Sequence, residues 1–338
     1  MNHRPGTLFG VRIRAALGVL GALCATTLLL VPAADAGAQT KPAASNKVVT
    51  AAIAAALSKH AIPADPNKLT PDYLSIIQND PNSLQGTSWL KGNCNPYSNP
   101  SQAAAPQPCF YGSTSASRTI VIFGDSYVGN WIPALDAVGK SLGYRIAAFE
   151  FAGCITPFVA PTSSSPASYQ ACTQFHSALP AAVQALHPLA VLAANGTPAW
   201  GSGDSSWVQG MVTAFNEVTA NSPTTARILL GTGPHLPHPA PACLAAYPQS
   251  LQKCTLTYDP AGVGANQYAA ALARDQQGAT AAHATLVPTS QWFCLKNQCP
   301  VLINNMLVYA DADHVSIVYS KYLAKVLQQA LAPVIPAS

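Results

Sequence analysis

The stretch Thr119-Ile-Val-Ile-Phe-Gly-Asp-Ser126 decides how this chain folds. Its first five residues are β-branched or apolar and predict a buried strand that ends at the Gly-Asp-Ser turn. Open α/β sheets place their sites at the carboxyl ends of strands, so such a turn lifts the hydroxyl of Ser126 to that edge. The hydroxyl becomes a nucleophile when a positioned base removes its proton. The stretch therefore predicts a first strand and a candidate catalytic serine.

The partner of this turn lies near the other end of the chain, in Asp311-Ala-Asp-His314. An imidazole there supplies a base, and a carboxylate can hold that imidazole in one tautomer. Either motif alone arises readily by chance. Together, one after a strand and one before the last helix, they predict a Ser-His-Asp site.

From Arg118 onward, apolar strand patterns alternate with helical patterns, which is typical of a parallel sheet covered on both faces. We expect a three-layer α/β/α sandwich with a parallel sheet of about five strands. The expected strands cover 119–123, 144–151, 189–194, 228–231 and 285–287. The expected helices cover 131–142, 172–186, 207–220, 265–282 and 320–331, after an Ala-rich helix at 48–57.

The first 36 residues are typical of an export signal. Three arginines (Arg4, Arg12 and Arg14) precede the apolar stretch from Ala15 to Val31, and Ala34-Asp-Ala36 is a small-x-small cleavage site. The apolar stretch is short for a membrane span, so cleavage is preferred over an uncleaved anchor. We therefore expect a secreted or extracytoplasmic protein, with a linker and lead-in over 37–93 and the main domain over 94–335.

The mature chain keeps an even number of cysteines, which in an exported protein indicates disulfides. They fall into four local couples: Cys94 with Cys109, Cys154 with Cys172, Cys243 with Cys254, and Cys294 with Cys299. Zinc is the competing interpretation, but no C-x-x-C couple is present.

Charge is sparse, because Asp, Glu, Lys and Arg make up only 9% of the residues. Removal of the signal takes away three arginines and Asp35, which lowers the net charge from +4 to +2. With no basic block, the chain offers no electrostatic case for binding nucleic acid. The expected ligand is neutral or weakly discriminated by charge.

The strand–Gly-Asp-Ser–helix start and the D-x-x-H end resemble the SGNH (GDSL-like) hydrolase family. The cysteine order around them and the stretch G-D-S-Y-V-G-N-W-I-P-A-L are similar to one branch, the extracytoplasmic SGNH domain of acyltransferase-three O-acetyltransferases. The resemblance covers Cys94 to Leu331. Two features depart from that branch: Tyr127 stands where histidine is usual, and the multi-span membrane half is absent.

The resemblance implies a role for each site residue. Ser126 is the nucleophile, His314 the base, and Asp311 rather than Asp313 the orienting acid, because the family spacing is D-x-x-H. Oxyanion donors are expected from the N–H of Ser126, from Gly153 after the second strand, and from the amide of Asn195 after the third.

Two other features attract a functional interpretation. The pair His235 and His238 lies in a Pro-rich loop without a carboxylate or third histidine close in sequence, so no metal is expected there. Trp200 is the best candidate for a sugar platform, whereas Trp131 and Trp207 lie on apolar helix stripes and are expected in the core.

These observations predict an exported serine esterase or acyltransferase that removes or transfers O-acyl groups on carbohydrate, with acetyl as the expected acyl group. No cofactor is expected, and the partners are an O-acylated carbohydrate or glycan acceptor. Two alternatives stay open: an accessory transferase subunit working with a separate membrane acyltransferase, and a glycan-binding module without turnover, for which Tyr127 is the hint.

The cysteine pairing gives the first testable prediction. Mass spectrometry of the unreduced mature protein should find no free thiol and the four local couples, because the compartment is oxidising. A free thiol at Cys294 or Cys299, or a bound zinc ion, would contradict it.

Overall fold

The computed structural model of this 338-residue chain describes residues 44–90, 94–95, 100–159, 166–196, 204–261 and 268–335. The expected export signal and Trp200 lie outside these residues. Within them, no helix is both long and apolar enough to cross a membrane. The described residues all belong to one compact unit.

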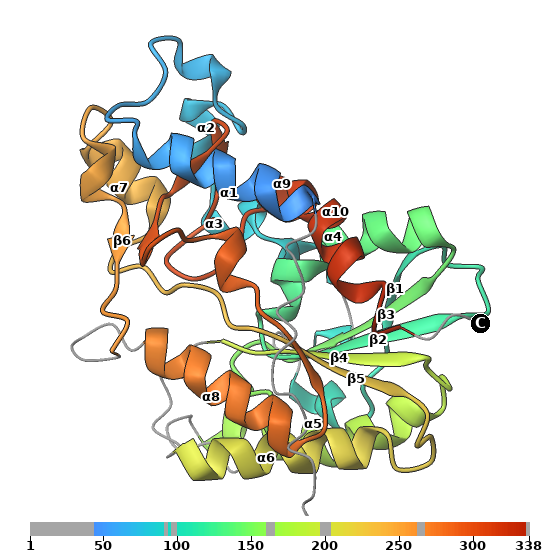
Figure 1. Ribbon diagram of the computed structural model, residues 1–338. Coiled ribbons are helices and arrows are strands. Elements are labelled where there is room, and N and C mark those ends of the chain that lie inside the picture. Colours follow the sequence, from blue (N-terminus) through green and yellow to red (C-terminus); the bar gives the residue numbers. More distant parts are fainter. Residues whose placement is uncertain are drawn as a thin grey trace, which may run out of the picture. The chain divides into compact units, whose positions relative to one another are not determined.

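The centre of this unit is a six-stranded mixed sheet in the order β1-β3-β2-β4-β5-β7 (Figure 1). Five neighbouring strands run parallel, as the sequence predicts, and β1 adds an antiparallel edge beside β3. The strands are β1 (Cys109–Gly112), β2 (Thr119–Gly124), β3 (Arg145–Glu150), β4 (Ala190–Ala194), β5 (Ala226–Leu230) and β7 (Thr285–Val287). The edge strand β1 escaped sequence analysis because it is short and partly exposed, without a buried apolar run.

The expected helices are present. The longer ones are α1 (Ala44–Leu57), α4 (Val128–Leu142), α5 (Pro166–Gln184), α6 (Asp204–Val218) and α8 (Tyr268–Ala281). The last expected helix is split into α9 (Ile317–Tyr322) and α10 (Ala324–Leu331). Short helices are η1 (Pro66–Lys68), α2 (Tyr73–Gln78), α3 (Pro81–Leu84), η2 (Gly86–Trp89), η5 (Pro100–Ala104), α7 (Ala240–Ala246), η6 (Leu251–Lys253) and η7 (Ser290–Trp292). Two small antiparallel two-stranded sheets pair β6 (Leu256–Thr257) with β8 (Gln298–Cys299), and β9 (Leu302–Ile303) with β10 (Met306–Leu307).

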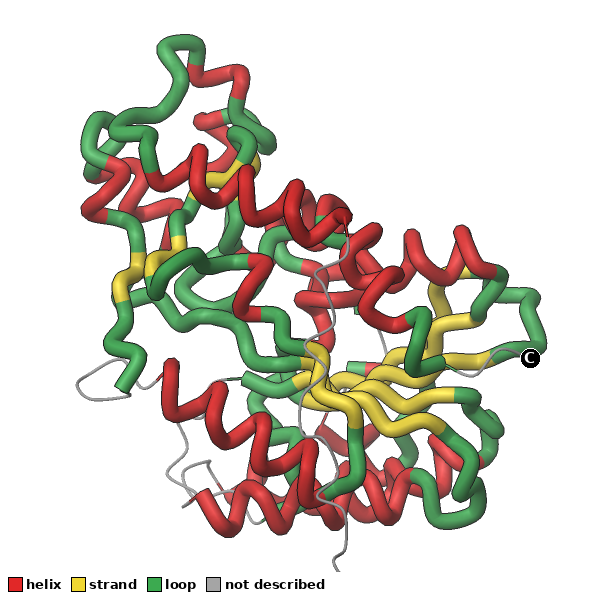
Figure 2. Tube along the Cα trace, in the orientation of Figure 1, coloured by secondary structure: helices red, strands yellow, loops and turns green. Residues whose placement is uncertain are grey.

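The side chains of β2 divide the core into two halves. Ile120 and Ile122 belong to the half that is covered by α4, α1, α9 and α10. Val121 and Phe123 belong to the half under α5, α6 and α8. Alternate residues of a strand point to opposite faces, so a strand that is apolar throughout must be covered on both. Figure 2 shows these helices on either side of the strands, which confirms the expected α/β sandwich.

Two helix-breaking residues affect helix α4. Gly143 caps its C-terminus in the left-handed region, at φ 70°. Pro133 lies inside the helix. Because proline has no N–H, the carbonyl of Gly129 lacks its usual helical partner.

The described part of the lead-in, residues 44–90, packs against the main domain through buried side chains. Val49 and Ile53 of α1, Ile76 of α2, Leu69 and Leu84 are all buried in the same core half as α4. The region from residue 44 to 90 therefore contributes apolar burial to the main unit.

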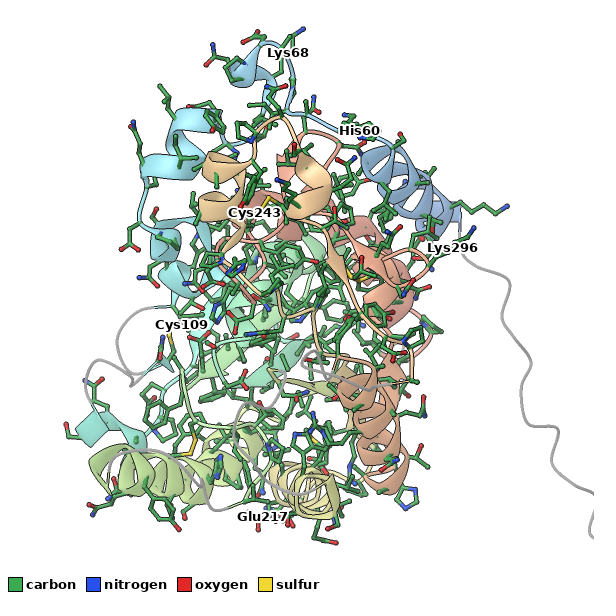
Figure 3. All side chains as sticks on the ribbon, turned by 90° about the vertical axis from the view of Figure 1, so that its left-hand side faces the viewer. His60, Lys68, Cys109, Glu217, Cys243 and Lys296 are labelled. Atoms are coloured by element: carbon green, nitrogen blue, oxygen red, sulfur yellow. A yellow bond between two sulfur atoms is a disulfide. The ribbon has the colours of Figure 1, made fainter. Side chains whose placement is uncertain are left out.

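All four local cysteine couples form disulfides in the structure: Cys94–Cys109, Cys154–Cys172, Cys243–Cys254 and Cys294–Cys299. Figure 3 labels Cys109 and Cys243, one sulfur-bearing residue from each of two pairs. Each bond closes a loop of 5 to 18 residues, so the pairing follows from sequence proximity.

The last residue of β2 yields a stability prediction. Gly124 has φ 149°, and a Cβ there would overlap the carbonyl oxygen of Ala194 on β4. Gly124→Ala should therefore lower the free energy of unfolding by about 3 kcal/mol or more, from backbone strain and overpacking together. Urea unfolding measures the change. Gly143→Ala is the control, because a Cβ at that position meets nothing within 4 Å and only the strain of positive φ remains. An equal loss in both variants would contradict the close-approach argument.

Candidate active site

The turn that carries Ser126 is tied to the two strands beside β2. The N–H of Asp125 donates to Thr156 Oγ1 at 3.1 Å. That hydroxyl donates to the carbonyl of Ala194, at the end of β4, at 2.6 Å. The turn thus sits at the carboxyl edge of the parallel sheet, where the sequence places it, and its backbone is fixed from both sides.

The structure brings the two ends of the chain together at this turn. His314 Nε2 lies 2.7 Å from Ser126 Oγ, across 188 residues of sequence. On the other side of the ring, Nδ1 lies 2.8 Å from Asp311 Oδ2. With Nδ1–H donating to the carboxylate, Nε2 is left with a lone pair that faces the serine hydroxyl. The arrangement can deprotonate an attacking hydroxyl.

The two aspartates beside His314 differ in geometry. The second oxygen of Asp311 accepts the backbone N–H of Asp313 at 2.9 Å and that of His314 at 2.7 Å. These bonds hold the Asp311 carboxylate in the plane of its own turn. Asp313 Oδ1 lies 3.5 Å from His314 Nδ1, and its other oxygen lies 3.5 Å from Nδ1 of His235. Asp311 is therefore the better placed of the two to orient the imidazole.

These contacts shift both pKa values. Burial raises the pKa of Asp311, but the hydrogen bond and positive charge of His314 outweigh it and hold the pKa at about 2. Burial lowers the pKa of His314, but its hydrogen bond to Asp311 and the charges of Asp311, Asp313 and Asp125 outweigh it and raise the pKa above 6.5. A raised pKa makes the His314 imidazole more basic than a free one, and protonation in acid removes its free lone pair.

Two carboxyl groups lie near the turn, one partly buried and one fully buried. Asp125 accepts the N–H of Tyr127 at 2.9 Å and that of Gly196 at 2.8 Å, while burial raises its pKa to about 6. Burial, with the charge of Asp125, also raises the pKa of Glu150 well above its ordinary value. Sequence analysis did not single out either carboxyl. The Gly-Asp-Ser motif could have identified Asp125, whereas Glu150 belongs to no motif and lies at the end of a strand.

Gly153 and Asn195, the expected oxyanion donors besides Ser126, follow the two strands that pair with β2. Gly153 follows β3 at φ 77°, and the space next to its Cα is open. Asn195 follows β4 and is 2% exposed, and its amide is near Asp275, whose pKa is raised to about 7 by burial. Within the described part of the chain, neither amide atom of Asn195 has a hydrogen bond of regular geometry. The interaction with Asn195 lowers the pKa of Asp275 against that burial, so the amide and the carboxyl group lie next to each other.

Two residues of the G-D-S-Y-V-G-N stretch support the base from below. Tyr127 is buried, and its ring centre lies 5.5 Å from that of His314. Asn130, one turn into α4, accepts the N–H of Val315 through Oδ1 at 2.8 Å. The nucleophile helix thus holds the residue next to the base. The stretch was recognised in the sequence, but not these contacts.

The loop with His235 and His238 packs against the catalytic turn. The N–H of Leu236 donates to the carbonyl of Ala312 at 2.7 Å, and that of Ala240 to the carbonyl of Asp311 at 3.0 Å. Its role in the structure is thus to brace the turn that carries the base. As expected, Trp131 and Trp207 are buried in the core, at 3% and 2% exposure.

Two groups of ligand-type side chains cluster among the described residues. One is Cys154, Cys172 and His176, whose sulfur atoms are joined in a disulfide and so offer no thiolate. The other is Asp311, Asp313 and His314. Its imidazole already bonds a carboxylate on one side and Ser126 on the other, which is the arrangement of a base rather than of a metal ligand.

Comparison with known proteins gives a consistent result. Residues 93–329 match the model of the family described as SGNH domain (fused to AT3 domains). The fold is similar to the periplasmic domain of a lipopolysaccharide acetyltransferase from Salmonella ser. Paratyphi A, with 14% identity, 69% of this chain and 88% of that chain covered, and a TM-score of 0.54. A carbohydrate acetylesterase from Sinorhizobium meliloti is a more distant match, with 15% identity, 64% and 99% covered, and a TM-score of 0.43. No curated protein is similar enough to count as a match.

The two aspartates should respond differently to substitution. Asp311→Asn keeps the shape but favours the wrong tautomer of His314, so we expect turnover of an acetyl ester to fall roughly 10³- to 10⁴-fold. Asp313→Asn should cost far less, because its oxygen lies 3.5 Å from the ring. The measurement is kcat for both variants at one pH.

The same variants should move the pH profile. Activity of the unmodified protein should fall in acid with a midpoint above 6.5, since His314 must be unprotonated to act as base. Loss of the Asp311 charge should move that midpoint to lower pH. Equal losses of turnover in the two variants, or a larger one in Asp313→Asn, would refute the assignment.

Proposed function

Because the chain belongs to the family of SGNH domains that occur fused to AT3 domains, we propose that it removes or transfers O-acyl groups, acetyl first among them, on carbohydrate. The family supports acyl transfer or hydrolysis in general. The observation that carries the finer proposal is the aligned contact of Ser126 Oγ, His314 Nε2 and Asp311 Oδ2.

The proposed reaction has two halves. Ser126 Oγ attacks the ester carbonyl while His314 Nε2 takes its proton, and the protonated imidazole then gives that proton to the leaving sugar oxygen. The resulting acyl-enzyme is attacked by water or by a sugar hydroxyl, again deprotonated by His314. Water completes an esterase cycle, and a sugar hydroxyl completes a transferase cycle.

The tetrahedral intermediates need donors aimed at the developing oxyanion. We assign this role to the N–H groups of Ser126 and Gly153 and to the amide of Asn195. The position of Asn195 directly after β4, the parallel neighbour of the strand that ends at the serine turn, supports its assignment. Loss of one such donor typically costs about 3 kcal/mol of transition-state stabilisation.

The proposed location is outside the cytoplasm. Four disulfides fit an oxidising compartment, and the basic and apolar start of the sequence fits an export signal. The fusion of related SGNH domains to AT3 domains favours a separate membrane acyltransferase as acyl donor if the protein is a transferase. A binding module without turnover is disfavoured by the short Ser126–His314 contact.

A single experiment separates these functions. Purified protein is mixed with an activated acetyl ester, with and without an oligosaccharide acceptor, and acetate and acetylated sugar are measured. Ser126→Ala should abolish both turnover and labelling by a serine-directed phosphonate, because each needs the activated hydroxyl. Ser177→Ala, on an exposed part of α5, is the control and should behave as the unmodified protein.

The outcomes are distinct. Acetate release without acceptor supports an esterase, and acceptor-dependent acetylation supports a transferase. Undiminished labelling of Ser126→Ala would refute the nucleophile. Silence of the unmodified protein in every arm would favour the binding module over the proposed enzyme.

A further inference from the structure

A segment of the lead-in lies directly against the nucleophile turn. Helix α3 ends at Leu84, and η2 begins at Gly86. The hydroxyl of Thr87 donates to the backbone carbonyl of Ser126 at 3.2 Å, across 39 residues. The segment precedes residue 93, where the match to the SGNH family begins. It is thus an addition that reaches the reacting residue from outside the shared domain.

The contact between this segment and α4 is too close for side chains on either side. A Cβ on Gly86 would overlap the carbonyl oxygen of Gly129, and a Cβ on Gly129 would overlap the backbone and hydroxyl of Thr87. The Gly129 carbonyl is the one that Pro133 leaves without a helical partner. Gly86 and Thr87 therefore pack directly against the first turn of α4, which begins just after Ser126.

Glu150 joins the same contact from below. It is fully buried at the end of β3, and its Oε2 accepts the N–H of Gly129 at 3.0 Å. Its other oxygen accepts from the amide of Asn95 at 2.9 Å. The hydroxyl of Thr87 is also close enough to influence this carboxyl. Thr87 thus packs between a buried carboxyl and the serine backbone, so its position is fixed.

The other end of the segment touches the loop of the base. Gln85 is 5% exposed and pairs with Ser316 in an isolated antiparallel β-bridge. Ser316 is two residues after His314 and caps α9 by accepting the N–H of Tyr319. One short stretch, Gln85–Thr87, therefore contacts the nucleophile turn at one end and the base loop at the other.

We propose that Gln85–Thr87 is a clamp that sets the position of Ser126 relative to His314, and that Thr87 is a positioning residue acting through the Ser126 carbonyl. This inference rests on the proposed function. The clamp spans two segments that the chain itself connects only through 188 residues. A hydroxyl-to-carbonyl bond at the nucleophile restricts the backbone rotation that would swing Ser126 Oγ away from Nε2. Misplacement of reacting atoms by about 1 Å can cost on the order of 100-fold in rate.

The test compares variants of Thr87 that keep its shape or keep its hydroxyl. Thr87→Val removes the donor and should slow phosphonate labelling and lower kcat on an acetyl ester by about 10- to 100-fold, with KM unchanged. Thr87→Ser keeps the donor and should restore most of the rate. Thr213→Val is the matched control, because it removes a threonine hydroxyl bonded to the carbonyl of Gln209 on α6, far from the clamp in the fold.

A second measurement does not depend on turnover. Hydrogen–deuterium exchange of peptides covering 124–131 should be faster in Thr87→Val than in the unmodified protein, Thr87→Ser or Thr213→Val. If the unmodified protein neither labels nor turns over, the proposed function fails while the exchange data still test the clamp. The clamp is refuted if Thr87→Val exchanges as slowly as Thr213→Val. If the unmodified protein is active, the clamp is also refuted when Thr87→Val exchanges faster but is labelled at the rate of the unmodified protein.

Discussion

The contact between Ser126 Oγ and His314 Nε2 is the constraint on which the rest of the structure depends. The two residues come from opposite ends of the domain, so their separation of 2.7 Å cannot be set by local geometry. The parallel sheet fixes the serine turn at its edge, and α4 fixes the base loop through Asn130 and Val315. A general base works only within hydrogen-bond reach of the proton it removes. The sheet and α4 together therefore set the distance between Ser126 Oγ and His314 Nε2.

The carboxyl groups of Asp125 and Glu150 hold the backbone around the serine turn, although removing a charge from water costs free energy. Asp125 is partly buried and Glu150 fully buried, and their raised pKa values reflect that burial. In return each accepts backbone N–H groups that would otherwise be unsatisfied at the turn and at the start of α4. A satisfied polar network of this kind specifies one backbone arrangement more sharply than apolar packing does. Rigidity at the nucleophile is what the acyl-transfer chemistry requires.

The lead-in and the disulfides extend this rigidity outward. Residues 44–90 bury apolar side chains such as Ile53 and Ile76 in the same core half as α4, so the lead-in and the nucleophile helix are held together by packing. The Cys94–Cys109 bond then ties the end of that region to the edge strand β1. The part of the chain that matches the SGNH family contains Ser126, Asp311 and His314. The lead-in supplies contacts to the backbone that carries them.

The sequence by itself predicted the alternation of strands and helices, the Gly-Asp-Ser and D-x-x-H motifs, and four local cysteine couples, but not which cysteines bond. Each of these predictions rests on hydrophobic periodicity, on a motif or on short spacing, which are properties of residues close in sequence. The D-x-x-H spacing already pointed to Asp311, which the structure places within hydrogen-bond distance of the imidazole. Only the tertiary structure decided that β1 adds an edge to the sheet and that Thr87 and Glu150 lie together beneath Ser126. Isolated polar residues such as these carry no periodic signal. Their partners are brought to them by the packing of distant segments, so no local pattern could reveal the contacts.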